Sequence, residues 1–133
     1  MGSRLAIGEL SASSGVKVPT IRYYESVGLI PAPSRTTGNR RTYMQRDVER
    51  LCFIRHAREL GFEIDAIRQL LALSEQPHQS CLAVDAIAST QLAAIESRIK
   101  RLKALKRELE AMIQSCARGK IAECKILETL SRS

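Results

Sequence analysis

The chain has 133 residues and a formal net charge of +7, with 4% aromatic residues and no Trp. This composition favours helices over a β-sandwich and fits one domain, or a small domain with an appendage. No apolar run is long enough to span a bilayer and no apolar signal core is present, so we expect a cytoplasmic protein with no membrane partner. The basic balance indicates a polyanion as partner.

The positive charge is concentrated in the first half of the chain. Residues 4–58 carry ten Lys and Arg side chains against four acidic ones, a balance of +6. Helices stabilised by surface salt bridges would carry basic and acidic side chains in similar numbers, as the later part of the chain does. The alternative is a generically basic surface without a specific partner.

The first apolar positions predict two short packed helices. Ile7, Leu10, Val16 and Ile21 have the required spacing, and Gly15 lies where a tight helix-helix turn needs a residue tolerant of positive φ. The second helix is predicted over roughly residues 19–27 and ends at Gly28. Polar and aromatic side chains on its other faces suit phosphate and base contacts in a major groove. They are Thr20, Arg22 and Tyr23.

Residues 35–43 predict a hairpin that turns at Gly38-Asn39. Its arms are polar, which suits a wing lying along a phosphate backbone better than a core strand. A third helix is predicted from Asp47 to about Leu60, and a fourth from Ile64 to Leu71. We therefore expect residues 1–75 to form a winged helix-turn-helix DNA-binding domain with two supporting helices, in a fold dominated by α-helix.

A polar linker, residues 76–81, precedes one long predicted helix over residues 82–113. Its apolar positions step by three and four residues for more than three heptads, which is the pattern of a coiled-coil seam. A single helix cannot bury such a stripe, so we expect a homodimer through a long antiparallel coiled-coil dimerisation helix. The alternative is a helix folded back on the third and fourth helices.

Three of the four cysteines predict a metal site. Cys52 lies in an apolar helical stripe and is interpreted as core. Cys116 and Cys124 flank a short loop in residues 114–133, a predicted metal-binding loop with a short C-terminal helix. Cys81 lies a helix length upstream, and an antiparallel dimer places it beside the other chain's loop. Thiolates select Zn, Cd, Hg, Pb or Cu(I). His78 is either a fourth ligand or simply solvated.

Catalytic motifs are missing from the sequence. There is no Ser-His-Asp set, no glycine-rich phosphate loop and no CxxC spacing of a thiol oxidoreductase. We therefore do not expect an enzyme.

The chain resembles the mercury-resistance regulator (MerR) family of bacterial transcription factors over almost its whole length. The resemblance implies a dimer on a palindromic operator, with double-stranded promoter DNA and RNA polymerase as partners. Metal binding would twist the DNA and activate a metal-resistance or efflux promoter. The motifs that carry the resemblance are Ile7-Gly8-Glu9-Leu10, Thr20-Ile21-Arg22-Tyr23-Tyr24-Glu25, Gly28-Leu29-Ile30, Arg41-Thr42-Tyr43 and residues 54–62.

The family resemblance also implies the site residues. Family members usually have an aromatic residue where this chain has Arg40, so this position departs from the pattern. In the metal-sensing branch, Cys116 and Cys124 would bind the metal from one chain and Cys81 from the other. The implied DNA contacts are Lys17, Thr20, Arg22, Tyr23, Arg40, Arg41, Tyr43 and Arg58.

The choice of metal depends on Cys81. Copper(I) sensors of the family carry Ser at this position, so the residue favours a divalent ion, with cadmium, lead or mercury first and zinc next. The loop length resembles that of the copper sensors, which leaves a copper(I)-responsive regulator as an alternative. A further alternative is a redox-sensing transcription factor in which Cys116 and Cys124 form a reversible disulfide.

Overall fold

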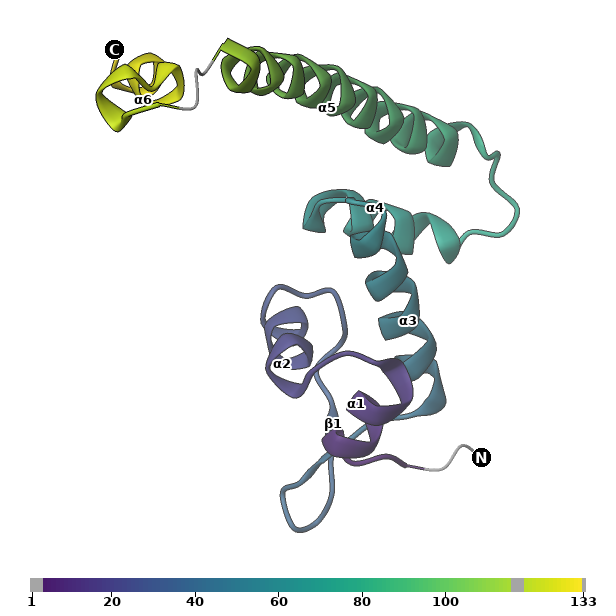
Figure 1. The fold of residues 1–133 in the computed structure, drawn as a ribbon. Helices are drawn as coiled ribbons and strands as arrows, with labels where there is room; N and C mark the ends of the chain where they lie inside the picture. The colour runs from purple at the N-terminus through teal and green to yellow at the C-terminus, as the bar shows by residue number, and fades with distance from the viewer. Residues whose placement is uncertain (1–3, 116–118, 133) are drawn as a thin grey trace. The chain divides into compact units, whose positions relative to one another are not determined.

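The structure is a computed structural model that describes residues 4–115 and 119–132 (Figure 1). These residues are mostly helical, with one small two-stranded sheet, as predicted. The chain divides into two compact units, Met1–Ile87 and Ala88–Ser133, which are described separately. Among the described residues, none of the helices combines the length and apolarity needed to cross a membrane.

Two short helices, α1 (Ile7–Ser14) and α2 (Val18–Ser26), form the predicted helix pair. Gly15 ends α1 with φ 74°, a left-handed conformation that glycine adopts at little cost. Pro19 lies in the first turn of α2, where its missing N–H leaves no intrahelical hydrogen bond unmade. The second helix begins and ends one residue earlier than predicted.

The predicted hairpin is confirmed as strands β1 (Ser34–Arg35) and β2 (Arg41–Thr42), which pair antiparallel. Asn39 has φ 62° in the connection between them, a conformation that asparagine tolerates better than most residues. Short polar strands of this kind form a wing on the surface of a helical domain and contribute little to its core.

The segment before α1 joins the wing, which the sequence did not indicate. Leu5 and Tyr43 form an isolated antiparallel bridge, with N···O distances of 2.7 and 2.8 Å. Arg4 donates from Nη1 to Thr42 Oγ1 at 3.2 Å. The second wing strand is therefore fixed on both of its edges.

Two further helices, α3 (Gln45–Glu59) and α4 (Ile64–Ser74), complete the first unit. We predicted that the third helix starts at Asp47, but it begins two residues earlier. The Asp47 carboxylate instead accepts a hydrogen bond from the Met44 N–H at 2.8 Å, which caps the first turn. The fourth helix continues three residues beyond the predicted Leu71.

The core of the first unit lies between α1, α2, α3 and α4. α1 packs against α2 and α3, and α3 packs against α4 (Figure 1). Removal of apolar side-chain surface from water is the main stabilising contribution here, at about 25 cal/mol for each Å² buried. The core residues with no exposed surface are Leu10, Ile21, Leu29, Leu51, Ile54 and Ile67.

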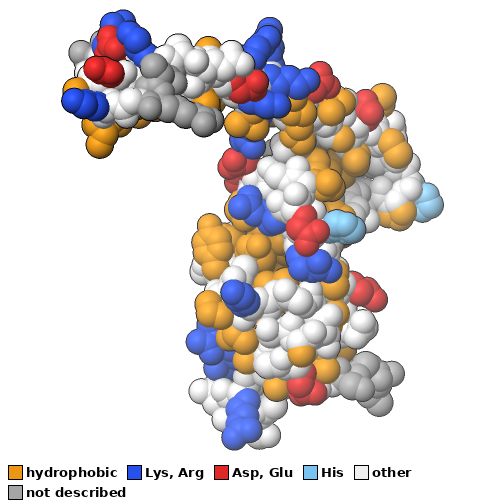
Figure 2. Space-filling model, viewed as in Figure 1, with side chains coloured by type: hydrophobic (Ala, Val, Ile, Leu, Met, Phe, Trp, Pro, Cys, Tyr) orange, Lys and Arg blue, Asp and Glu red, His pale blue; other side chains and the backbone are white. Residues whose placement is uncertain are grey.

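The long helix α5 (Leu82–Ser115) has 34 residues and confirms the predicted helix, with two additional residues at its end. None of its side chains is buried within the described part of the chain. Along the predicted seam, Leu92, Ile99, Leu102 and Leu109 are between 45% and 64% exposed. Hydrophobic side chains lie along the visible face of this helix in Figure 2.

A 3₁₀ turn (Ile121–Glu123) and a final helix, α6 (Lys125–Ser131), follow α5. The predicted short C-terminal helix is therefore present. Glu128 forms ion pairs with Lys125 at 3.4 Å and with Arg132 at 2.9 Å. The hydrogen bond and charge of Lys125, followed by those of Arg132, lower the pKa of Glu128 below its ordinary value.

Candidate nucleic-acid interface and thiol positions

The helix α2 presents the residues predicted to read DNA. Its buried side chains are Ile21 and Tyr24, which hold one face against the core. Arg22 and Tyr23 are exposed on other faces, and the Tyr23 side chain is 50% exposed. A polar face carrying an arginine and a tyrosine suits contact with phosphates and base edges.

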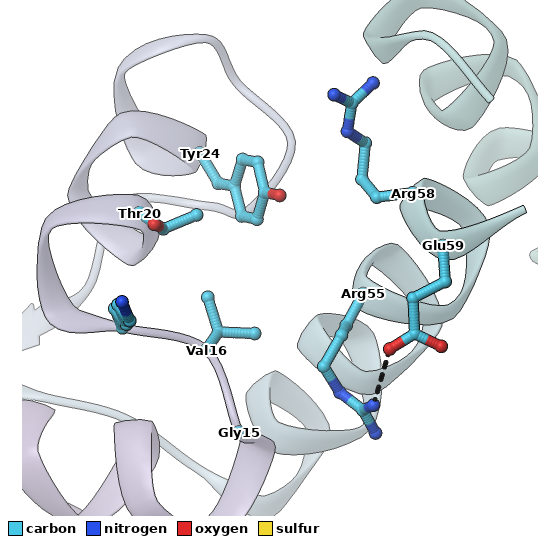
Figure 3. Close-up of a pocket in the computed structure, with 8 residues that line it drawn as sticks. Gly15, Val16, Thr20, Tyr24, Arg55, Arg58 and Glu59 are labelled. Atoms are coloured by element: carbon cyan, nitrogen blue, oxygen red, sulfur yellow. Dashed lines mark hydrogen bonds and ion pairs between the residues drawn. The ribbon is translucent and has the colours of Figure 1, made fainter. Parts of the chain in front are cut away.

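An open hollow of about 370 Å³ lies between α2 and α3. Lys17, Thr20 and Arg58, three of the predicted DNA contacts, are among its lining residues. Figure 3 shows Thr20 and Tyr24 on the α2 side, with Arg58 on the α3 side. Arg58 also donates from Nη1 to the Phe62 carbonyl at 2.9 Å, which fixes its guanidinium beside the end of α3.

A second hollow, of about 350 Å³, lies between α2 and the wing. Arg22 and Arg41, both predicted DNA contacts, line it together with Arg35. Arg35 contributes to the basic charge of residues 4–58 but was not among the predicted DNA contacts. In the structure Arg35 lies opposite Arg41 in the pairing of the two wing strands. Three guanidiniums around one hollow suit a phosphate group.

The remaining wing residues differ in their exposure. Arg40 is exposed, as a phosphate contact requires. Tyr43 is only 1% exposed, and its hydroxyl donates a hydrogen bond to the Glu25 carboxylate. The sequence-based interpretation of Tyr43 as a DNA contact does not fit this position, because its ring packs in the core and its one polar atom is already paired.

Two arginines of the basic first half serve the fold. Arg50 donates from Nε to the Leu29 carbonyl at 2.7 Å, and its Nη1 pairs with Glu75 at 3.1 Å. Arg55 donates from Nε to the Ser14 carbonyl at 3.1 Å and pairs with Glu59 at 3.0 Å, as drawn in Figure 3. The face of this unit seen in Figure 2 still carries several Lys and Arg side chains.

The cysteines occupy different positions. Cys52 is half-buried, and its Sγ lies 4.0 Å from the Ser14 carbonyl oxygen, packed against the core as predicted. Cys81 is an exposed thiol directly before α5, and Cys124 is half-buried between the 3₁₀ turn and α6. Cys116, the third predicted ligand, lies outside the described residues.

The described part of a single chain brings no three His, Cys, Asp or Glu residues together as a metal site. His78 is exposed in the connection between α4 and α5. Because α5 is an uninterrupted helix of 34 residues, it is roughly 50 Å long. The predicted ligands Cys81 and Cys124 come before and after that helix in the chain.

These features define a winged helix-turn-helix DNA-binding protein: a helix pair, a two-stranded wing, and arginines around the hollow between α2 and the wing. The profile described as "MerR HTH family regulatory protein" matches residues 5–74, and the one described as "MerR, DNA binding" matches residues 48–112. The chain belongs to the MerR family of DNA-binding transcription regulators.

Known proteins resemble the chain over nearly their full lengths. It is 42% identical over 125 residues to the HTH-type transcriptional regulator HmrR of Rhizobium leguminosarum bv. viciae, covering 94% of this chain and 96% of that protein. It is 38% identical over 130 residues to the mercuric resistance operon regulatory protein of Bacillus cereus, covering 97% and 98%. The crystal structure of the transcription regulator PbrR691 from Ralstonia metallidurans CH34 in complex with lead(II) is 40% identical, with coverage of 96% and 99% and a TM-score of 0.84.

Proposed function

We propose that the chain is a metal-responsive transcription regulator that binds a palindromic operator as a homodimer. A soft metal ion bound by three cysteines converts it into an activator of a metal-resistance or efflux promoter. The observation that carries this proposal is the exposed apolar stripe of α5 together with the thiols placed before and after that helix.

DNA contact is assigned to the two hollows beside α2. Lys17, Thr20 and Arg58 surround one of them, and Arg22 and Arg41 surround the other. Tyr23, which follows Arg22 on α2, and Arg40, which precedes Arg41 in the wing, are also exposed. Basic side chains on both sides of a helix that enters the major groove neutralise phosphates and fix the register of the helix, while residues of the helix read base edges.

Dimerisation is assigned to α5. Leucine and isoleucine side chains repeat at intervals of three and four residues, and they remain exposed in the single chain. Burying one such side chain contributes about 1.5–3 kcal/mol, so a seam of several heptads supplies a strong driving force for pairing. An antiparallel arrangement lays the start of one helix beside the end of the other.

The metal is assigned to Cys81 of one chain with Cys116 and Cys124 of the other. Thiolates prefer soft ions, which places cadmium, lead and mercury first and zinc next. Three thiolates around a divalent ion leave one net negative charge, which Lys120 in the same loop partly offsets. The names of two relatives, one a regulator of mercuric resistance and one a lead(II) complex, support this choice.

Activation requires a second partner, RNA polymerase. In this proposal the dimer stays on its operator with or without metal, and metal binding changes the twist of the DNA so that polymerase engages both promoter elements. The thiols and the basic hollows come from different parts of the chain, so DNA binding and metal response are separable.

The test is a titration of the anaerobic protein with Cd(II), Pb(II), Hg(II), Zn(II) and Cu(I), followed by run-off transcription from the promoter next to its gene. We expect a soft divalent ion to activate transcription and Cys81→Ser to abolish the response. Activation by Cu(I) alone would support the copper alternative. Activation by peroxide without metal would support the redox alternative, and either result would overturn the proposal.

A further inference from the structure

The hollow between α2 and the wing contains one acid among its bases. Glu25 lines it together with Arg22, Arg35 and Arg41. A carboxylate in such surroundings is expected to pair with a guanidinium. Among the described residues, however, Glu25 belongs to none of the ion pairs. Its carboxylate accepts a hydrogen bond from the Tyr43 hydroxyl instead.

Tyr43 is held firmly enough to keep the Glu25 carboxylate in this hydrogen bond. Its ring is buried, and its backbone exchanges hydrogen bonds of 2.7 and 2.8 Å with Leu5. Burial, and then the hydrogen bond and charge of Glu25, raise the pKa of Tyr43 above its ordinary value. The hydroxyl therefore keeps its proton at neutral pH and remains a donor. Arg41 and Arg22 act on Tyr43 in the opposite direction, so both charges lie within electrostatic range.

The guanidiniums of the hollow retain unused donors. Nη1 of Arg41 is buried and has no hydrogen-bond acceptor among the described residues. Arg35 uses Nη1 for the Asn39 carbonyl at 3.2 Å, which leaves its other nitrogens. A buried guanidinium N–H without an acceptor is costly. The guanidinium groups of Arg22, Arg35 and Arg41 also line the open hollow, where a phosphate oxygen is an acceptor that suits their accessible N–H groups.

We propose that Tyr43 is a positioning residue for DNA binding: its hydroxyl holds the Glu25 carboxylate out of ion pairs with Arg22, Arg35 and Arg41, so that these arginines remain available to a DNA phosphate. Without the hydroxyl, the carboxylate loses its donor and turns to the nearest guanidinium, where it competes with the phosphate. This inference rests on the proposed DNA contacts of Arg22 and Arg41.

The test compares Tyr43→Phe, Glu25→Gln and the double variant by fluorescence anisotropy with a fluorescein-labelled duplex of mixed sequence. Phosphate contacts dominate binding to such a duplex. We expect Tyr43→Phe to bind roughly tenfold more weakly, the effect of about one charged hydrogen bond. Glu25→Gln should bind at least as tightly as wild type, because a neutral amide does not compete for the arginines. The double variant should bind within about twofold of Glu25→Gln.

A purely structural role for the Tyr43 hydroxyl predicts a different result. In that case the double variant binds as weakly as Tyr43→Phe, because both lack the same hydroxyl, and this result would overturn the inference. Glu25→Gln, which keeps an acceptor for Tyr43, provides a second test if the Phe variants fold poorly. Weaker DNA binding by Glu25→Gln would also overturn the inference.

Arg22→Ala and Arg41→Ala, measured on the same duplex, separate this inference from the proposed function. If neither variant weakens binding, the proposed DNA contacts are wrong and the inference fails with them. If both weaken binding while Tyr43→Phe binds like wild type, the contacts stand and only the role of Tyr43 is wrong.

Discussion

Nη1 of Arg68 in α4 donates a hydrogen bond at 2.7 Å to the carbonyl oxygen of Val27, the C-cap residue that directly follows α2. The last carbonyls of a helix have no intrahelical donor, and the helix dipole places partial negative charge there. Arg50 supplies a second such bond, to Leu29 just beyond the same helix end. The helix that carries the proposed base contacts is therefore held at its end by arginines from α3 and α4.

Replacing Arg68 with Met should destabilise the first unit while keeping the aliphatic stem. Because Arg68 is exposed, water compensates part of the loss, and we expect the free energy of unfolding to fall by roughly 0.5–1.5 kcal/mol. Urea denaturation followed by circular dichroism measures the change. Arg46→Met is the control, since Arg46 is exposed and makes no hydrogen bond or ion pair with the described residues. Equal effects of the two substitutions would contradict the prediction.

Replacing Arg22 or Arg41 with Ala should weaken DNA binding and reduce its salt dependence. Each lost phosphate contact lowers the slope of log affinity against log salt by roughly 0.9. Binding isotherms across a range of potassium chloride concentrations measure this slope. Arg101→Ala is the matched control, because Arg101 is exposed in α5 and lies outside both hollows. An unchanged slope for Arg22→Ala and Arg41→Ala would mean that neither side chain meets a phosphate.

The raised pKa of Tyr43 predicts how stability responds to alkaline pH. Folding keeps this phenol protonated at pH values where the unfolded chain releases the proton, near the ordinary value of 10.0. The stabilisation is fully present below that pH and is lost as pH rises toward the folded-state pKa. Melting temperatures between about pH 9 and pH 11 should therefore fall more steeply for wild type than for Tyr43→Phe. Tyr23→Phe, at a half-exposed phenol, controls for loss of a tyrosine, and parallel curves for wild type and Tyr43→Phe would disprove the prediction.

The elements of this fold could be predicted because their signals are local. Apolar spacing located the helices to within a few residues, and Gly38-Asn39 located the wing turn, where Asn39 adopts positive φ. The long helix α5 could be predicted equally well, since its apolar period continues for several turns.

The roles of individual polar side chains could not be predicted in the same way. The acceptor of Arg68 lies 41 residues away in the chain, and that of Arg50 lies 21 residues away. Tyr43 carries a hydroxyl suitable for a phosphate, yet packing places it in the core with Glu25, 18 residues away. A sequence shows which groups donate and accept, but only the tertiary fold decides which of them meet.

The seam of α5 can be tested by placing charge on it. Replacing Ile95 and Leu102 together with Glu should dissociate the dimer and abolish operator binding, because two charged side chains per chain would have to be buried in the interface. Sedimentation velocity measures the change of mass. Arg101→Glu introduces an acid on the outer face of the helix and should leave the dimer intact. An unchanged dimer in the double variant would mean that the seam is misassigned.

Substitution of Cys81 tests whether this residue is a ligand of a metal site shared between two chains. Cys81→Ser should lose the response to divalent metal while dimerisation and metal-free DNA binding remain normal, because one of three thiolates is removed from the coordination shell. Copper(I), which two sulfurs satisfy, should still bind at Cys116 and Cys124. Metal titration under anaerobic conditions, followed by sulfur-to-metal charge-transfer absorbance, measures the loss.

A mixed dimer makes the test specific. One chain carries Cys81→Ser and the other carries Cys116→Ser with Cys124→Ser, so one end of the dimer keeps all three thiols and the other end keeps none. Such a heterodimer should bind about half as much Cd(II) as wild type, with wild-type affinity, because its single intact site has lost no ligand. The homodimer of the Cys116→Ser/Cys124→Ser chain, which keeps only Cys81 of the three proposed ligands, should bind none. If the Cys81→Ser homodimer binds Cd(II) with wild-type affinity and stoichiometry, Cys81 is not a ligand and the site lies within one chain.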